Sequence, residues 1–335
     1  MLSPVRSWRP SATALRRTFL GALVMNIVIV VTGGAVRLTA SGLGCPTVPK
    51  CTEDSMVATR EMGVHGAIEF GNRLLTFVVT AAVVAALVTA WRARRRDLVR
   101  LGGVLFLGIV AQALLGAVTV ITGLNPVTVM AHFLVSMVLI AVALHAYRRA
   151  GGDPVRDPGG VRAEIRVGAW ALTGAVAATL VAGTVVTGTG PHSGDEDASD
   201  RLPFDLETVS QVHADLVFLV VGLTVGLLVA ARASAAPASL ARRVSVLLGV
   251  VLAQGLVGYV QYLTDLPVAL VAAHVLGACL VWVATLRVLL ATAPGPVPAQ
   301  RGSEGQQRVD RDGDEQQREV RDRAVEEPHR AALQR

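Results

Sequence analysis

The chain has 335 residues, of which 52% are hydrophobic, a mean hydropathy of +0.53 and a formal net charge of +6. This composition is too apolar for a soluble domain of this size. Nucleic-acid binding is not expected, because the arginines stand between apolar runs, as the positive-inside rule requires of a membrane protein. Three cysteines are too few for a disulfide scaffold or a zinc cluster.

Eight apolar runs are long enough to cross a bilayer, which takes about 20 residues. In lipid every backbone polar group must be bonded within its own segment, so each run predicts a helix. We therefore expect an all-α integral membrane protein with eight transmembrane helices. The runs cover approximately residues 18–39, 64–90, 101–122, 127–146, 167–187, 209–231, 244–263 and 267–290.

Arginines gather before the first run and in every second connection, whereas the connection at 194–207 is acidic. The positive-inside rule assigns the arginine-rich side to the cytoplasm. Because the number of runs is even, both termini are predicted to be cytoplasmic.

A repeated stretch divides the chain into halves. Residues 111–133 and 253–275 both begin Ala-Gln-x-Leu-x-Gly, and both contain a short polar break with a proline. Each places a histidine 20 residues after the glutamine, at His132 and His274. Such matched spacing indicates internal duplication and predicts two pseudo-symmetric four-helix bundles.

Five parts follow from this reading. They are a cytoplasmic N-terminus (1–17), an N-terminal four-helix half (18–148), a cytoplasmic linker (149–166), a C-terminal four-helix half (167–292) and a disordered cytoplasmic tail (293–335). The tail is predicted to be disordered because it is rich in Arg, Glu, Asp and Gln without any apolar period.

Two histidines stand at equivalent depths on different helices of the second half. His213 and His274 fall within about two turns of the outer ends of the sixth and eighth runs. An ionisable residue at membrane depth is a functional hypothesis, and two neutral imidazoles facing one cavity suit a six-coordinate haem. Zinc would need further ligands, and Asp215 is expected on another face of its helix.

The second run carries a polar stripe. His65, Glu69 and Asn72 follow one another at about one turn each, which puts them on one face of a helix. Arg73 and Arg37 are the candidate countercharges for the carboxylate. The alternative interpretation of the stripe is a polar network that closes the outer mouth of the bundle.

Together these residues resemble haem A synthases of the eight-helix bacterial type, over about residues 19–290. The family converts haem O to haem A by oxidising a ring methyl to a formyl group, through two hydroxylations and loss of water. The matching pieces are Ala35-Val-Arg-x-Thr-x-Ser-Gly-Leu-x-Cys45-Pro46 with Cys51, Glu69-Phe-Gly-Asn72-Arg73, Thr187-Gly-Thr-Gly-Pro-His-Ser-Gly194, His213 and His274.

The resemblance implies a role for each site residue. Resident haem b, the implied cofactor, would be ligated by His213 and His274 and would pass electrons. His132 would face the substrate haem in the N-terminal half, so that iron is bound through these three histidines. Glu69 would be the catalytic carboxylate.

The resemblance also implies a disulfide between Cys45 and Cys51, and both cysteines fall in one short loop on the outer, oxidising side.

One departure from the family pattern matters. The family has Glu-x-x-His-Arg, whereas this chain has Asn72 in place of the histidine, and an amide is a poor iron ligand. Two alternatives stay open: His132 alone holds the substrate haem and leaves an open face, or His65 supplies the second imidazole. The protonation state of Glu69 is also left open.

The implied partners are haem O as substrate, haem O synthase, cytochrome oxidase assembly factors and a membrane electron donor. A homo-oligomer is left open, and the implied location is a bacterial cell membrane. Two other functions compete. A haem-b electron carrier such as a quinol-linked cytochrome would leave Glu69 and the cysteine loop unused. A transporter built from parallel repeats would not explain the histidine pair.

Overall fold

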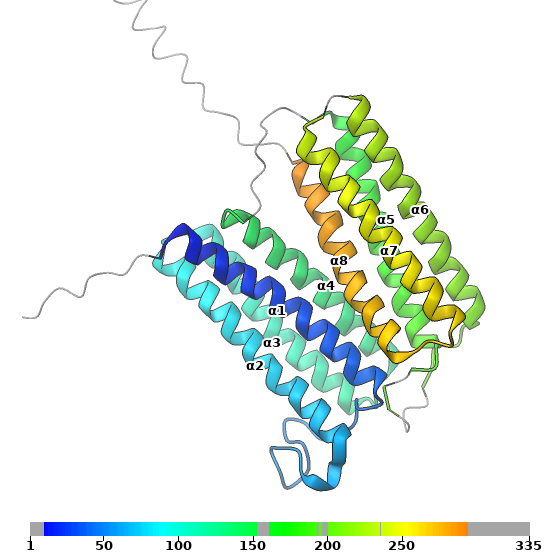
Figure 1. Ribbon diagram of the computed structural model, residues 1–335. Helices are drawn as coiled ribbons and strands as arrows, with labels where there is room; N and C mark the ends of the chain where they lie inside the picture. Colours follow the sequence, from blue (N-terminus) through cyan, green and yellow to red (C-terminus); the bar gives the residue numbers. More distant parts are fainter. Residues whose placement is uncertain (1–9, 153–160, 193, 196–199, 235, 294–335) are drawn as a thin grey trace, which may run out of the picture. The chain divides into compact units, whose positions relative to one another are not determined.

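The computed structural model describes residues 10–152, 161–192, 194–195, 200–234 and 236–293. Regular structure in these residues is entirely helical, which confirms the predicted all-α class (Figure 1). The elements are α1 (Ala12–Leu38), a 3-10 helix η1 (Arg60–Met62), α2 (Gly63–Arg92), α3 (Arg96–Ile121), α4 (Pro126–Arg149), α5 (Ala163–Thr189), α6 (Leu206–Ala233), α7 (Ala238–Leu263) and α8 (Val268–Ala291).

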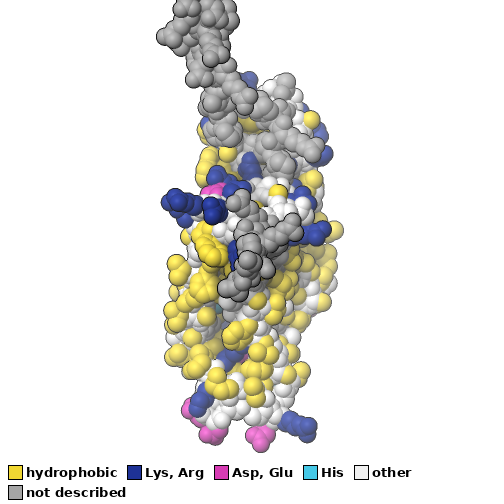
Figure 2. All heavy atoms as spheres, turned by 90° about the vertical axis from the view of Figure 1, so that its left-hand side faces the viewer, with side chains coloured by type: hydrophobic (Ala, Val, Ile, Leu, Met, Phe, Trp, Pro, Cys, Tyr) yellow, Lys and Arg dark blue, Asp and Glu magenta, His cyan; other side chains and the backbone are white. Residues whose placement is uncertain are grey.

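All eight α-helices of the described residues are long and apolar enough to cross a membrane. Figure 2 shows hydrophobic side chains over the middle of one face, with charged side chains gathered mostly toward its two ends. The chain is therefore a multi-pass membrane protein by the length and composition of its helices. Of the predicted tail at 293–335, all but residue 293 lies outside the described residues, as do residues 153–160 of the predicted linker.

Several helices begin earlier than the apolar runs indicate. The first helix starts at Ala12, six residues before its run, because Ser11 caps it and accepts a hydrogen bond from the backbone N–H of Ala14 at 3.1 Å. Asp205 caps α6 in the same way, and hydrogen bonds from the hydroxyl and backbone N–H of Thr208 hold the pKa of this carboxyl below its usual value.

Each half arranges its four helices in a ring of neighbours. In the N-terminal half α1 and α3 each contact α2 and α4, and in the C-terminal half α5 and α7 each contact α6 and α8. Consequently α2 lies diagonally across from α4, and α6 across from α8. Each half also has an apolar core, and Cys279 and Leu286 of α8 belong to the core of the N-terminal half. This common order is consistent with the predicted repeat, which stays an interpretation.

The halves meet along α1, α4, α5 and α8. The indole N–H of Trp282 on α8 donates to the carbonyl of Met137 on α4 at 2.9 Å. At the helix ends that the sequence predicts to lie outside the cytoplasm, called the outer ends below, the backbone N–H of Gly42 donates to the carbonyl of Gly194 at 2.7 Å. The outer connections of the two halves are thus bonded to each other.

The orientation in the membrane is a testable prediction. Alkaline phosphatase is active only outside the cytoplasm, so fusions in the connections after α3 and α7 should be active, and those after α2 and α6 inactive. A fusion of green fluorescent protein at the same four places should give the reverse pattern. Active phosphatase after α2 would contradict the cytoplasmic assignment of the arginine-rich side.

Candidate functional site

A buried carboxylate on α2 holds the outer loop between α1 and α2. Glu69 is only 5% exposed. One of its oxygens accepts from the backbone N–H of Cys45 at 2.5 Å, and the other accepts from the Nε and Nη2 atoms of Arg73 at 3.1 and 2.5 Å. Both carboxylate oxygens therefore have strong donors, as a buried charge requires.

Arg73 extends this network along the loop. Its Nη2 donates to the carbonyl of Cys45 at 2.7 Å, and its Nη1 donates to the carbonyls of Thr47 and Lys50 at 2.9 and 3.1 Å. Cys45 and Cys51 belong to this loop and are fully buried, with their sulfur atoms paired. The loop is thus tied to α2 through its main chain, as the alternative interpretation of a closing polar network expects.

Arg37 does not pair with Glu69, so its proposal as a second countercharge was wrong. Its Nε donates to the carbonyl of His192 at 2.7 Å and its Nη2 to the carbonyl of Thr187 at 3.1 Å. The reason is its place at the outer end of α1, beside the end of α5 and the connection after it. Arg37 links the halves instead of neutralising the carboxylate.

His65 lies apart from the buried carboxylate although both belong to the predicted stripe. It stands in the first turn of α2, is exposed, and has its Nδ1 2.9 Å from the hydroxyl of Ser41. The stripe therefore divides between an exposed histidine beside the outer loop and a buried carboxylate below it.

The C-terminal half brings its two predicted histidines together. The ring centres of His213 and His274 lie 6.4 Å apart with an interplanar angle of 67°. The Nδ1 of His213 is 3.1 Å from the carbonyl of Thr179 on α5. A ring whose Nδ1 is bonded to a carbonyl is held in one orientation and leaves Nε2 to bind a ligand.

The repeated glutamines hold the backbone of the histidine helices. Gln254 on α7 donates to the carbonyl of His274 at 2.8 Å, and Gln112 on α3 donates to the carbonyl of His132 at 2.9 Å. Gln112 also donates to the hydroxyl of Ser136. These contacts give the glutamine amide groups partners inside the membrane spans and fix each glutamine helix against its histidine helix.

Glycines on neighbouring helices lie against the imidazole rings. A Cβ added at Gly183 or Gly258 would lie 3.1 Å from the Cε1 of His213 or His274 respectively, and one at Gly116 would lie 3.3 Å from the Cε1 of His132. Larger residues at these places would displace the rings.

Asn72 occupies a comparable position on α2. Its Oδ1 accepts from the hydroxyl of Thr32 on α1 at 2.8 Å, and a Cβ added at Gly33 would lie 3.9 Å from its Nδ2. Asn72 thus faces a glycine of the preceding helix, as the three histidines do.

Sequence reasoning missed these glycine partners in part. Gly116 and Gly258 belong to the repeated Ala-Gln-x-Leu-x-Gly motif, and their repetition with the histidines was the available signal. Gly33 and Gly183 carry no such signal, because neither stands in a recognised motif.

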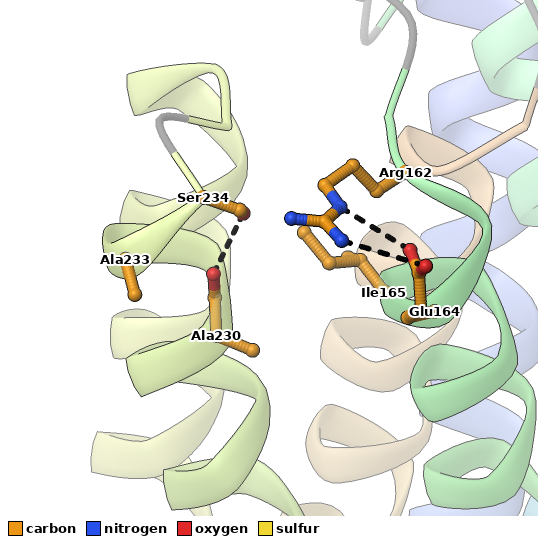
Figure 3. Close-up of a pocket in the computed structure, with 6 residues that line it drawn as sticks. All are labelled: Arg162, Glu164, Ile165, Ala230, Ala233 and Ser234. Carbon is orange, nitrogen blue, oxygen red and sulfur yellow. Dashed lines mark hydrogen bonds and ion pairs between the residues drawn. The ribbon is translucent and has the colours of Figure 1, made fainter.

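Two other features lie away from the histidines. A surface hollow of about 280 Å³ lies between the start of α5 and the end of α6 (Figure 3), lined by Arg162, Glu164, Ile165, Ala230, Ala233 and Ser234. It stands at the arginine-rich ends of these helices, so it does not belong to the histidine site. In the described part of the chain no three His, Cys, Asp or Glu residues are grouped as a metal site.

Comparison with known proteins gives one family. The model described as COX15-CtaA, cytochrome oxidase assembly protein, matches residues 16–192.

Curated relatives carry the name heme A synthase. One from Lysinibacillus sphaericus (strain C3-41) is 32% identical over 130 residues, covering 38% of this chain and 42% of that protein. One from Geobacillus kaustophilus (strain HTA426) is 31% identical over 120 residues, covering 35% of this chain and 37% of that protein. The chain thus matches less than half the length of these relatives.

The loop network predicts how firmly the cysteine loop is held. Replacing Arg73 by Ala removes three contacts to loop carbonyls and leaves Glu69 buried without its ion pair, at a cost on the order of 1–3 kcal/mol. We expect a membrane-impermeant reductant to expose Cys45 and Cys51 to alkylation faster in Arg73→Ala than in the unaltered protein.

Arg60→Ala is the matched control, because Arg60 is an exposed arginine of η1 whose side chain has no bonded partner in the described part of the chain. Equal rates in all three proteins would contradict the anchoring role. Alkylation of both cysteines before any reductant is added would contradict the predicted disulfide itself.

Proposed function

Because the chain belongs to the COX15-CtaA family of cytochrome oxidase assembly proteins, we propose that it is a haem A synthase, which oxidises a ring methyl of haem O to a formyl group. The observation that carries this proposal is the facing pair His213 and His274 in the C-terminal half. Each hydroxylation oxidises the methyl carbon by two electrons; with O2 as the oxidant, two further electrons are needed to reduce its second oxygen atom to water, and the pair would deliver them. Haem O synthase, assembly factors and a membrane electron donor are the partners this function requires.

The histidine pair fits a haem b. An imidazole nitrogen binds a metal ion at about 2 Å and the ring centre lies roughly 1 Å farther out, so rings on opposite sides of one ion have centres about 6 Å apart. The measured separation of 6.4 Å meets this requirement. A haem held by two imidazoles would supply one-electron transfer without an open coordination position.

His213 and His274 are held in place before any haem is bound. His213 is oriented by its hydrogen bond to the Thr179 carbonyl, and the backbone at His274 is held by Gln254. Gly183 and Gly258 leave the room that the two rings occupy. These contacts would fix the ring of His213 and the backbone of His274 in advance, which keeps the cost of binding low.

Glu69 would serve the N-terminal half, where His132 would face the substrate. A carboxylate can accept a proton or stabilise positive charge that develops on the substrate methyl carbon. Arg73 and the backbone N–H of Cys45 hold the carboxylate in one orientation. The loop that covers this end of α2 would also keep water from the carboxylate.

One observation favours a second candidate, a haem-b electron carrier without oxygenation chemistry. Both oxygens of Glu69 are already bonded to Cys45 and Arg73, which is what a purely structural carboxylate would show. Haem extraction from cells that make haem O distinguishes the two functions, because only the synthase accumulates haem A.

The histidine pair gives a spectroscopic prediction. Replacing either His213 or His274 by Ala should abolish the low-spin spectrum of the resident haem, because one axial position loses its imidazole. His145→Ala is the control, since this histidine lies in the last turns of α4 near Arg149, at the other end of the helix from His132. Unchanged spectra in both alanine variants of the pair would overturn the assignment.

The carboxylate gives a prediction about activity. Glu69→Gln should keep the resident haem spectrum but stop haem A formation or leave the hydroxylated intermediate. The glutamine amide also places an N–H donor against Arg73 or the N–H of Cys45, so the loop is weakened as well.

Comparison with Arg73→Ala separates the two effects, with haems extracted and resolved by chromatography. If Glu69 acts in the reaction, Glu69→Gln loses far more haem A than Arg73→Ala. Equal losses would reduce Glu69 to a loop anchor, and normal haem A from Glu69→Gln would refute its catalytic role.

A further inference from the structure

Four side chains of this protein share one arrangement. Asn72, His132, His213 and His274 each lie against a glycine of the helix that precedes their own in the chain, namely Gly33 on α1, Gly116 on α3, Gly183 on α5 and Gly258 on α7. All four stand on the even-numbered helices, which form the diagonals of the two halves. The N-terminal half therefore has the same order of helices and glycine partners around Asn72 and His132 as the C-terminal half has around its two histidines.

Asn72 fills its place in this framework only partly. The contacts of the three imidazoles with a Cβ at their glycines would be 3.1–3.3 Å, whereas the amide of Asn72 would be 3.9 Å from a Cβ at Gly33. The amide is also turned by its hydrogen bond, since Oδ1 accepts from Thr32. The room beside Gly33 thus exceeds what the asparagine uses.

Asparagine cannot take over the role of an imidazole at iron. A neutral amide offers a weak oxygen donor, and here that oxygen already accepts the Thr32 hydroxyl. Across the diagonal His132 keeps its glycine partner and its glutamine contact on α3. Of the two diagonal helices, α4 therefore offers an imidazole and α2 does not at the position of Asn72.

His65 is not placed to replace the missing imidazole. It is exposed in the first turn of α2, its Nδ1 faces the hydroxyl of Ser41, and it lies about two turns nearer the outer end of α2 than Asn72. Among the described residues, no glycine of another helix lies against its ring, whereas His132, His213 and His274 each have one.

We propose that the N-terminal half binds the substrate haem through His132 alone and leaves the Asn72 side of the iron open to a small ligand. This inference rests on the proposed function, because it assigns the coordination of that reaction's substrate. The two haem sites would then differ in chemistry. The iron between His213 and His274 would have both of its positions occupied by imidazoles, whereas the iron beside Asn72 would keep one position free. Only an iron with an open axial position binds a small molecule such as carbon monoxide.

Carbon monoxide is the probe that tests the proposal. The full-length protein is purified from cells that make haem O, reduced with dithionite and mixed with the gas. We expect a carbon monoxide difference spectrum from the substrate haem alone. Asn72→His should lose this signal and gain a second low-spin spectrum, because the new imidazole fits beside Gly33 and closes the iron.

A double variant makes the test specific to geometry. Gly33→Ala by itself should keep the carbon monoxide signal, since its Cβ would be at ordinary contact distance from Asn72. In Asn72→His the same alanine should displace the ring and restore the signal. His65→Ala is the control for the other histidine of α2 and should leave the signal unchanged.

Two outcomes would overturn the proposal. In the first, the substrate haem is low-spin and does not bind carbon monoxide, but binds it in His65→Ala. His65 would then be the second ligand, and continued formation of haem A would show that the proposed function still holds. A protein whose only haem is the one lost in His213→Ala would remove the substrate site altogether, and the absence of haem A from the same cells would then reject the proposed function as well.

Discussion

The histidines depend on a packing constraint between paired helices. An imidazole between two membrane helices needs room, and that room exists where the neighbouring helix has no Cβ. Gly116, Gly183 and Gly258 provide it, so each ring lies against the backbone of the neighbouring helix at that point. Because lipid offers no hydrophobic drive for helix association, such close contacts also hold the helix pairs together. Packing and ligand placement therefore rest on the same residues.

A second constraint acts at the outer end, where a carboxylate is buried. Removing a charge from water is costly unless donors replace its hydration. Glu69 receives donors from Arg73 and from the Cys45 backbone, and Arg73 in turn bonds to carbonyls of the loop. The requirement to satisfy one buried charge thus orders a loop that has little regular structure of its own. Arg37 does the same between the halves, with carbonyls at the end of α5 and just beyond it.

The sequence predicted correctly those features that depend on a pattern along the chain, such as the length of an apolar run or a repeated motif. Apolar runs of bilayer length located all eight helices, and the duplicated motif pointed to His274 and, with the depth of the runs, to its facing partner His213. The early start of α1 was missed, because a hydropathy pattern does not register a cap such as Ser11.

Contacts between distant segments could not be predicted in the same way. The hydrogen-bond partner of Arg37 depends on how α1 is rotated and on which connection lies beside the end of α1. The spacing of residues along the sequence indicates neither of these. Spacing placed His65 and Glu69 on one face of α2, but it could not tell that the first turn stays exposed while the second is covered by the loop. Helical periodicity predicts on which face of a helix a side chain lies, whereas the burial of that side chain depends on the segments that pack against the face.

The contacts that hold the cysteine loop have a consequence for how this segment can change over time. Glu69 and Arg73 reach only main-chain atoms of the loop: the N–H and carbonyl of Cys45 and the carbonyls of Thr47 and Lys50. Every amino acid has a backbone carbonyl, so substitutions at 47–50 would keep these contacts as long as the number of residues between the two cysteines is unchanged. Position 45 is different, because the disulfide with Cys51 requires a cysteine there and Glu69 accepts the backbone N–H of the same residue. Between the two cysteines, insertions and deletions, rather than substitutions, are what selection would remove.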